Sequence, residues 1–275
     1  MLVNGQAGAA VSPLDRGLLY GDGLFETIRF TRGVAPLWHR HMQRLLGGCE
    51  RLRLSAPEPA LLAAEAQQVL EGPGDAVVRI TLTRGSGQRG YAPPAQVDAT
   101  RIVSAHPLPV IAADWYRDGI RVRSCNLRVA SQPRLAGIKH LNRLEQVLAR
   151  AEWAGPDAIE PDVVEGLLCD QDDHLVSATA ANVFGVLDGT LLTPALDGSG
   201  VAGVLRAALL EAFPQCGVAV IPKEALMRFD EMFLCSSVRG VLPVRKIDGR
   251  TLRVGPWSRA AQSHWRTLGF PGGDA

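Results

Sequence analysis

The sequence has no marked excess of charge of either sign and no long apolar run. Its 29 basic and 28 acidic residues leave a formal charge of +1, so neither a nucleic-acid-binding nor a membrane-surface protein is indicated. No apolar stretch is long enough to span a bilayer. The first residues, MLVNGQAGAAVSP, lack the basic region and apolar core of a secretory signal. With 47% apolar and 21% charged residues, the composition is that of an ordinary globular protein.

The sequence also has no C-x-x-C pair, and its five cysteines are odd in number and widely spaced. This pattern favours neither a zinc site nor a disulfide framework. We therefore expect no metal, and we expect reduced, buried thiols in a cytoplasmic protein. The cysteines are Cys49, Cys125, Cys169, Cys216 and Cys235.

The first part of the chain predicts a mixture of helices and strands. Apolar periodicity predicts helices over about 39–54 and about 58–71. Alternating, β-branched residues predict strands over 77–84 and about 100–105. Two prolines in His106-Pro107-Leu108-Pro109 oppose helix and central strand alike, so we expect the join between two halves there. The predicted division is an N-terminal α+β domain at 1–106, a linker at 107–114 and a C-terminal domain at 115–275.

The second part continues without the regular βαβ alternation of a doubly wound fold. A strand is predicted over 120–129, and Pro256 in a first turn predicts a terminal helix ending near Leu268. Asp188-Gly189 and Asp248-Gly249 are strong hairpin signals. The expected fold class is therefore α+β in two halves. Further short strands are predicted at 167–169, 183–187 and 190–193.

The segment GIKHLNRLEQ, Gly137 to Gln146, places Lys139 just before a predicted helix. Asn142 and Glu145 form an N-x-x-E start signal for that helix. A lysine held half-buried at such a junction can present its neutral amine as a nucleophile toward carbonyls, the chemistry of Schiff bases. By itself the pattern is equally typical of a solvated surface lysine.

The helix after Lys139 is predicted from apolar residues that repeat at helical spacing. Gly155-Pro156 is expected to end it. The repeating residues are Leu141, Leu144, Val147 and Leu148.

Two glycine-rich segments can bind anionic groups. Gly200 to Arg206 runs from a turn into an apolar helix, where free N–H groups and the helix dipole favour an anion. It is not a Walker loop, because no Gly-Lys-Ser/Thr follows. In Arg84 to Tyr91, RGSGQRGY, the guanidinium of Arg89 can pair with a carboxylate and the phenol of Tyr91 can add a hydrogen bond. A plain turn and a tight hairpin with solvated arginines are the alternatives.

Taken together, these motifs resemble the fold-type IV family of pyridoxal-phosphate enzymes, which includes D-amino-acid and branched-chain aminotransferases. Lys139 followed by HLNR is similar to the version in 4-amino-4-deoxychorismate lyases. The resemblance runs from YGDGLFETIR, Tyr20 to Arg29, to SSVRGVLPV, Ser236 to Val244, with the signals in the family order. It implies two α/β domains with the cofactor between them, in a homodimer.

The resemblance also implies roles for individual residues. Lys139 would hold pyridoxal 5′-phosphate covalently and move protons during catalysis. Arg44, Ser237 and the amides of Val204 and Leu205 would contact the phosphate. Asn182 belongs to the family motif S/A-N-x-F.

The resemblance places the substrate at two segments. Arg89 and Tyr91 would lie in the loop that holds a substrate carboxylate. Phe25 and Thr27 would lie on an early active-site strand. Because side chains alternate along a strand, only one of Glu26 and Thr27 can face the site.

One position departs from the family pattern. The family has a glutamate five residues before the asparagine of its motif, where it keeps the pyridine nitrogen protonated, but here that position is Ser177. A weaker electron sink would handicap a transaminase. A lyase that forms an aromatic ring would be less affected. Asp172 or Asp173 could take the role instead under a shifted alignment.

The sequence therefore predicts a lyase that converts 4-amino-4-deoxychorismate to 4-aminobenzoate and pyruvate, a step toward folate. A D-amino-acid or branched-chain aminotransferase on the same scaffold is one alternative. A non-catalytic pyridoxal-phosphate-binding protein is the other.

Overall fold

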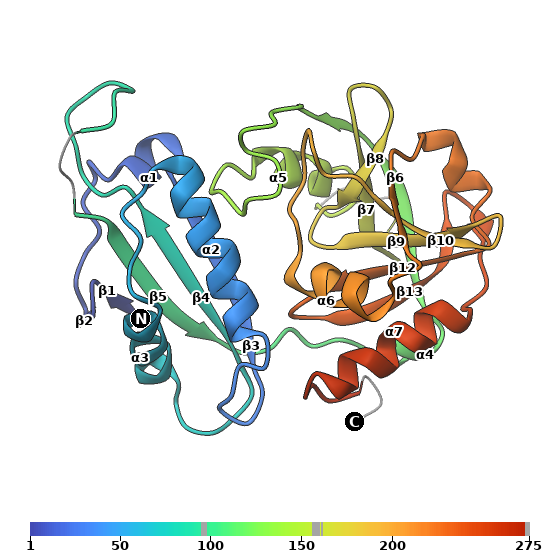
Figure 1. The fold of residues 1–275 in the computed structure, drawn as a ribbon, viewed down its shortest axis with the longest axis horizontal. Helices are drawn as coiled ribbons and strands as arrows, with labels where there is room; N and C mark the ends of the chain where they lie inside the picture. Colours follow the sequence, from blue (N-terminus) through green and yellow to red (C-terminus); the bar gives the residue numbers. More distant parts are fainter. Residues whose placement is uncertain (95–97, 156–159, 161, 273–275) are drawn as a thin grey trace. The chain divides into compact units, whose positions relative to one another are not determined.

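The computed structural model describes residues 1–94, 98–155, 160 and 162–272. The chain divides into two compact units, described in turn below (Figure 1). The first unit comprises Met1–Leu108 and Ile138–Asn142, and the second comprises Pro109–Gly137 and Arg143–Ala275. The grouping of 138–142 with the first unit had no counterpart in the predicted division, whose boundaries stay a prediction.

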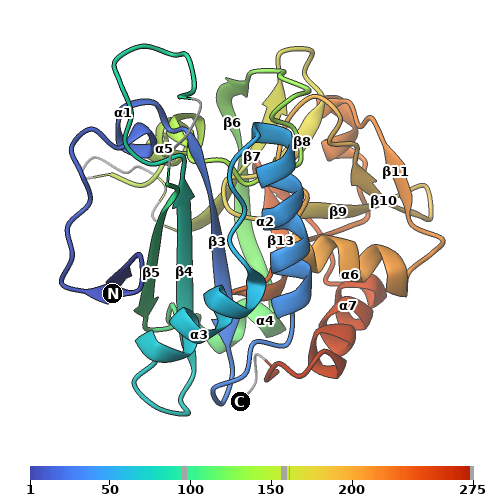
Figure 2. The ribbon, with the colours of Figure 1, turned by 60° about the vertical axis from the view of Figure 1, so that its left-hand side comes forward.

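The first unit is built on a five-stranded sheet in the order β2-β1-β5-β4-β3, with every neighbouring pair antiparallel. Helices α2 and α3 pack against β3, β4 and β5 (Figure 2). The elements are β1 (Leu2–Val3), β2 (Gln6–Ala7), α1 (Arg16–Tyr20), β3 (Gly23–Phe30), α2 (Trp38–Leu52), α3 (Pro59–Val69), β4 (Ala76–Thr83) and β5 (Thr100–His106).

The two faces of this sheet differ because side chains alternate along each strand. Leu24, Ile80 and Val103 belong to the face that the helices cover, and all three are almost fully buried. Gly48 of α2 lies so close to the Leu24 side chain that an added Cβ would stand 2.8 Å from it. The opposite face carries Phe25 and the residues in register with it on β4. The core of this unit therefore lies between the sheet and α2 and α3.

The second unit is built on a larger mixed sheet. Its strand path is β11-β10-β9-β12-β13-β6-β7-β8, with β14 paired to β13. The elements are α4 (Ala113–Arg117), β6 (Ile120–Val129), α5 (Leu144–Ala151), β7 (Val163–Asp170), β8 (Leu175–Ala178), β9 (Asn182–Leu187), β10 (Thr190–Pro194), α6 (Val204–Ala212), β11 (Gly217–Ala219), the 3₁₀ helix η1 (Lys223–Met227), β12 (Glu231–Ser236), β13 (Gly240–Ile247), β14 (Arg250–Thr251) and α7 (Pro256–Thr267).

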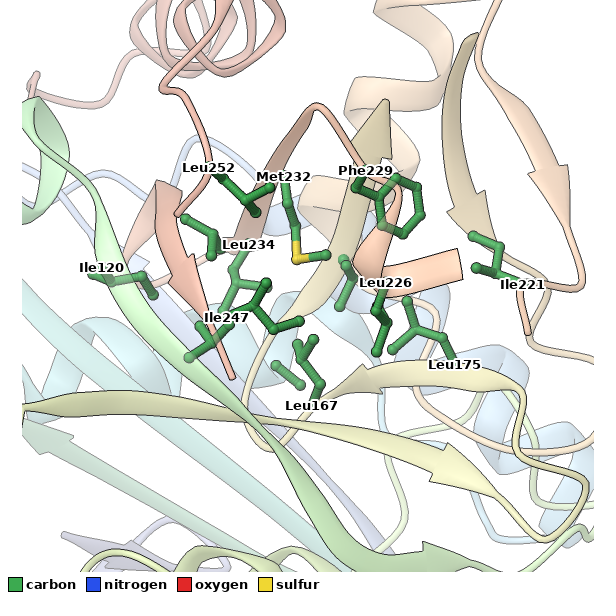
Figure 3. Close-up of a cluster of buried hydrophobic side chains, with 14 of the residues drawn as sticks. Ile120, Leu167, Leu175, Ile221, Leu226, Phe229, Met232, Leu234, Ile247 and Leu252 are labelled. Atoms are coloured by element: carbon green, nitrogen blue, oxygen red, sulfur yellow. The ribbon is translucent and has the colours of Figure 1, made fainter. Parts of the chain in front are cut away.

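A cluster of aliphatic and aromatic side chains fills the centre of the second unit (Figure 3). It joins β6 and β7 to β12, β13 and the segment around η1. Phe229 is fully buried, and its ring lies so close to Gly185 that an added Cβ would stand 2.7 Å from it. Because protein interiors are close-packed, this contact limits position 185 to glycine.

Most predicted elements are confirmed within a few residues. The helices expected over about 39–54 and 58–71 are α2 and α3, and the predicted early strands are β4 and β5. The terminal helix is α7, with Pro256 in its first turn. The α+β class is therefore confirmed.

Both predicted hairpins are confirmed as well. Asp188 and Gly189, between β9 and β10, have φ of 50° and 78°. Asp248 and Gly249, between β13 and β14, have φ of 44° and 90°. Positive φ at both central residues is what a tight type I′ turn requires.

The predicted start of the helix after Lys139 is wrong. Helix α5 begins at Leu144 with Arg143 as N-cap, and no side chain caps it. The Asn142 amide instead donates to Gly21 O (3.3 Å). Glu145 accepts from the backbone N–H of Ala130 (2.7 Å). Both polar side chains have longer-range partners, which local spacing does not show.

The end and the apolar face of α5 also differ from expectation. The helix ends at Ala151, and Pro156, half of the predicted stop signal, lies outside the described residues. The apolar residues of its periodic pattern are exposed rather than packed. They are Leu144, Val147 and Leu148.

The cysteines are free thiols, as predicted, and four of the five are buried while Cys216 is half-buried. Burial raises the pKa of Cys235 to about 12. In the described part of the chain, no helix combines the length and hydropathy needed to cross a membrane.

Candidate active site

Lys139 lies in a short segment that pairs with the edge strand β3 of the first unit. The N–H of Phe25 donates to Lys139 O (2.9 Å), and the N–H of Leu141 donates to Gly23 O (3.0 Å). Since β3 is the last strand in the sheet order, its outer edge is available for such pairing. Backbone hydrogen bonds to the sheet therefore set the position of this lysine.

The Lys139 side chain reaches the sheet face that carries Phe25. Its Nζ lies 4.3 Å from the centroid of the Phe25 ring. The guanidinium of Arg79, on the neighbouring strand, lies 4.1 Å from the same centroid. Thr27 stands directly opposite Arg79 in the β3–β4 register, so the two side chains share this face. Phe25, Thr27 and Lys139, all predicted site residues, are thus brought to one face together with Arg79.

Glu26 points to the opposite face, where it meets α2. It accepts from Arg44 Nε (2.8 Å) and Nη2 (2.6 Å) and from His41 Nδ1 (2.6 Å). Glu26 and His41 are each 1% exposed, and the Arg44 side chain is 12% exposed. The predicted alternation is thus resolved, with Thr27 on the Phe25 face and Glu26 in a buried charged network.

The protonation states of Glu26 and His41 depend on burial and on the charges of their neighbours. Burial by itself would raise the pKa of Glu26, but the charge of Arg44 and the hydrogen bonds from both partners hold it at about 2. Burial lowers the pKa of His41, and this outweighs the charge and the hydrogen bond of Glu26, which raise it, while the positive charges of Arg44 and Lys139 add to the lowering. Near neutral pH, His41 therefore donates as a neutral imidazole to an ionised Glu26.

Arg89 and Tyr91, the predicted carboxylate-binding pair, lie on an exposed loop of the first unit. Tyr91 is 85% exposed, and its ring makes an edge contact with Tyr20, with 5.4 Å between centroids. The Arg89 side chain is also exposed. Both side chains are accessible to a ligand in solution.

In the second unit, the predicted phosphate turn leads into α6 as expected. The N-cap is Gly203, which has no side chain, and no acidic residue stands in the first turn. The first amides of an α-helix have no intrahelical acceptor, so those of Val204 and Leu205 are suited to an anion. Asn182 fixes the turn by donating from Nδ2 to Val201 O (2.9 Å). Asn182 therefore positions the turn.

The two predicted serines lie on different strands of the second unit. Ser177 is nearly buried in β8, opposite Leu168 of β7. Ser237 directly follows β12 and is half-buried. Both hydroxyls are neutral donors.

The two aspartates predicted as alternatives to Ser177 lie outside its strand. Asp172 and Asp173 lie in the turn between β7 and β8, outside the strand that carries Ser177. Asp173 is about half exposed and forms an ion pair with Arg128. Asp172 is exposed, so Ser177 stays the predicted partner of the ring nitrogen.

The same turn holds a small group of possible metal ligands. Asp170, Asp172 and His174 have ligand atoms within 4.8 Å of one another. Their mutual hydrogen bonds account for this arrangement, since Asp170 accepts from the backbone N–H groups of the other two.

Sequence reasoning missed the charged side chains of Glu165 and Arg79 on the strands. Glu165 of β7 is 1% exposed, and it accepts from Arg239 Nη2 (2.5 Å) and Thr179 Oγ1 (2.5 Å). Arg79 of β4 is held over Phe25, and burial lowers its pKa. Both stand inside apolar strand patterns, where a charged residue that interrupts the run was the only available signal.

The sequence model of the amino-transferase class IV family matches residues 23–247. The chain belongs to this family. The match spans β3, the Lys139 segment, the α6 turn and β13, and so includes most of the residues described above.

Within the family, the chain is similar to both lyases and aminotransferases. It is 34% identical to an aminodeoxychorismate lyase of Vibrio harveyi, covering 89% of this chain and 90% of the relative. The crystal structure of 4-amino-4-deoxychorismate lyase from Pseudomonas aeruginosa superposes with a TM-score of 0.90 at 42% identity, over 97% of this chain and 98% of that one. A branched-chain amino acid aminotransferase structure from Escherichia coli gives a TM-score of 0.81 at 25% identity, over 99% and 94%. The fold-type IV resemblance is thus confirmed.

Proposed function

We propose that this chain is a pyridoxal-phosphate-dependent lyase that converts 4-amino-4-deoxychorismate to 4-aminobenzoate and pyruvate. The observation that carries the proposal is the placement of Lys139 on the sheet edge, with its amine beside Phe25 and Arg79. Relatives named as this lyase support it, at 34% identity for the Vibrio harveyi protein and 42% for the Pseudomonas aeruginosa structure. A relative named as a putative branched-chain-amino-acid aminotransferase, from Methanocaldococcus jannaschii, is 32% identical, so an aminotransferase is the alternative to test.

The residues present fit the proposed cofactor. The uncapped start of α6 offers backbone donors to a phosphate, and a lysine amine can bond covalently to an aldehyde. Lys139 and Arg44 would hold the cofactor from the first unit. Val204, Leu205 and Ser237 would contact its phosphate from the second, with Asn182 fixing the turn and Ser177 near the ring nitrogen. We also propose, as the sequence implied, that the cofactor contacts both units.

When bound, pyridoxal phosphate supplies an electron sink for the pair left when a proton leaves the amine-bearing carbon. In the proposed reaction the Lys139 amine removes that proton from the substrate ring. The bond between the ring and the enolpyruvyl oxygen then breaks, and the ring becomes aromatic. Lys139 returns the proton to the methylene carbon of the leaving enolate, which becomes pyruvate.

The substrate carries two carboxylates, and the chain offers two sets of groups to bind them. Arg89 and Tyr91 form the predicted set. Arg79 forms a second, because among the described residues no carboxylate or carbonyl accepts a hydrogen bond from it, although it is half-buried beside Phe25. A partly desolvated guanidinium gains most from an ionic partner. Phe25 and Thr27 would line the substrate site beside it.

The deciding experiment mixes the cofactor-loaded protein with 4-amino-4-deoxychorismate and follows 4-aminobenzoate and pyruvate together. Equal formation of both products is expected. Lys139→Ala should lower turnover by at least about 10⁴-fold, since it removes both the covalent link and the base. Full activity in Lys139→Ala, or no product from the loaded parent protein, would refute the proposal.

The two alternatives are separated by a simpler measurement. A D-amino-acid or branched-chain aminotransferase should convert its bound cofactor to the pyridoxamine form when D-alanine or L-leucine is added. A non-catalytic cofactor-binding protein should respond neither to these amino acids nor to the lyase substrate. The absorbance changes on adding the amino acids and on adding the lyase substrate together distinguish the three functions.

We further propose that the chain acts in the cytoplasm as a homodimer. Its free cysteines agree with a reducing compartment. Exposed apolar side chains on α1 and α5 are suited to burial against a second copy. Sedimentation at several concentrations, with Leu18→Glu and Leu144→Glu as disrupting variants, tests the dimer.

A further inference from the structure

Arg16 is a buried arginine, 3% exposed, in the short helix α1 of the first unit. Its guanidinium donates to three consecutive backbone carbonyls of the exposed loop after β4. The distances are 2.9 Å to Gly90 O, 3.0 Å to Tyr91 O and 3.5 Å to Ala92 O. One side chain therefore binds the backbone on both sides of Tyr91 and next to Arg89.

Three successive carbonyls cannot face one group in an extended strand, where they alternate in direction. The loop must curve around the guanidinium, and Gly90 has a φ of +103°, which glycine adopts most easily. Tyr20 supports the same curve, because its hydroxyl accepts from the N–H of Gly90 (3.3 Å). The shape of the loop is thus set by contacts from α1.

The beginning of the loop is fixed by the same cluster. The backbone N–H of Arg16 donates to Gly85 O (2.9 Å). Asp22 accepts from Arg16 Nε (2.9 Å) and from Arg84 Nε (2.8 Å). Burial acts to raise the pKa of Asp22, but hydrogen bonds from Arg84 and Arg16 lower it below its ordinary value. An ionised Asp22 therefore joins both arginines.

By contrast, the side chains of Arg89 and Tyr91 are exposed. Arg16 shapes the backbone from beneath, and Arg89 and Tyr91 remain available to a ligand. A loop that is already ordered loses less conformational entropy when a ligand binds.

We propose that Arg16 is a positioning residue for substrate binding, which holds the loop from Gly85 to Ala92 in the conformation that meets a substrate carboxylate. The inference rests on the proposed function in its assignment of Arg89 and Tyr91 to the substrate. Only a planar guanidinium can serve three carbonyls and Asp22 at once, because the lysine ammonium is a compact charge with three donors.

The test compares Arg16→Lys with the parent protein and with Arg117→Lys, an exposed arginine paired to Asp118 in the second unit. Arg16→Lys should raise KM for 4-amino-4-deoxychorismate by about ten-fold, the loss expected from one charge-assisted contact. Its kcat should stay within about three-fold and its cofactor affinity should not change, since Arg16 acts only through the loop. Hydrogen exchange of the amides in 85–92 should become faster. Arg117→Lys should match the parent in every measurement.

Two further variants keep the test decisive. Gly90→Ala alters the loop from its own backbone and leaves the Arg16 side chain in place, because nothing lies within 4 Å of the added Cβ while the φ of +103° strains any other residue. It should raise KM in the same way, and this result stands even where Arg16→Lys folds poorly. Arg89→Lys should raise KM without changing hydrogen exchange. In the double variant, KM should rise by less than the product of the two single increases, because both substitutions weaken the same contact with the substrate carboxylate.

An unchanged KM in folded Arg16→Lys and in Gly90→Ala would overturn the inference, as would unchanged exchange in Arg16→Lys. A change in kcat or cofactor affinity as large as the change in KM would reduce Arg16 to a general structural role. If the parent made no 4-aminobenzoate, the proposed function would fail by itself. The exchange data would still show whether Arg16 orders the loop.

Discussion

The Lys139 region of the first unit and the α6 turn of the second place their functional groups by different physical means. In the first region, the network of Glu26, His41 and Arg44, on the other face of β3 from the Lys139 side chain, is buried and charged. At the α6 turn, backbone amides and the neutral side chain of Asn182 set the geometry. A reacting lysine needs fixed charges nearby to set its electrostatic environment, whereas a phosphate can be held by main-chain dipoles that need no counter-charge. The first region should therefore be sensitive to charge and the second to shape.

The largest effect is expected from Glu26→Gln, which removes the charge at the centre of the first region. Breaking one side of a buried ion pair typically costs about 3–5 kcal/mol, because the partner charge is left uncompensated. We expect the free energy of unfolding to fall by about 3 kcal/mol, measured by urea denaturation. Asp118→Asn, in an exposed pair with Arg117, is the matched control and should leave the urea midpoint unchanged. A small effect of Glu26→Gln would mean that shape, and not charge, dominates here too.

The pH dependence of stability tests whether the Glu26 carboxylate is ionised in the folded protein. The folded pKa of Glu26 is about 2, lower than its ordinary value of 4.5. Its contribution to stability is therefore fully present above about pH 4.5 and is lost as pH falls toward 2. The stability difference between the parent protein and Glu26→Gln should shrink over this window. A difference that stayed constant from pH 6 to pH 3 would contradict the ionised state assigned to Glu26.

In the second region, Gly203→Ala should act through shape alone. An added Cβ would stand 2.0 Å from Asn182 Oδ1, so the amide must move and its bond to Val201 O is lost. We expect cofactor affinity to fall by about ten-fold and unfolding free energy by about 1–2 kcal/mol, the cost of one broken buried hydrogen bond. Equilibrium titration with pyridoxal phosphate and urea denaturation measure the two quantities.

Gly47→Ala is the control for this substitution. Gly47 is an exposed residue of α2 with nothing within 4 Å of an added Cβ. Alanine is favoured over glycine inside a helix by about 1 kcal/mol, so this variant should be slightly stabilised with unchanged cofactor affinity. Normal cofactor affinity in Gly203→Ala would show that the turn tolerates reshaping.

The comparison also shows what the sequence could predict. The hairpins at Asp188 and Asp248 and the turn before α6 depend on local patterns of glycine and aspartate, and they are confirmed. The role of Lys139, also predicted from a local pattern, stays a prediction. The pairing of the Lys139 segment with β3 joins parts of the chain that are far apart in sequence, and no local spacing reports it.

Arg16 and Arg79 were missed for the same reason. Arg16 stands in a short helix whose partners are loop carbonyls, which any sequence can supply. Arg79 is distinguished only by the lack of an acidic partner among the described residues, and this is known only from the three-dimensional structure. The motif residues were predictable, but the residues that position them depend on tertiary contacts.

The smallest effect is expected from Ser177→Glu, which would add a charge to β8 of the second unit. Ser177 is only 9% exposed in β8, and a glutamate there would provide an ionic partner for a pyridine nitrogen. We expect a shift in the absorbance maximum of the bound cofactor and faster conversion to the pyridoxamine form with D-alanine or L-leucine. Lyase turnover should change by less than about three-fold, because formation of an aromatic ring already drives the reaction. Ser177→Ala, which adds no charge, should leave the spectrum as it is. Identical spectra and rates in Ser177→Glu would show that this serine does not face the cofactor ring and has no bearing on which reaction the chain catalyses.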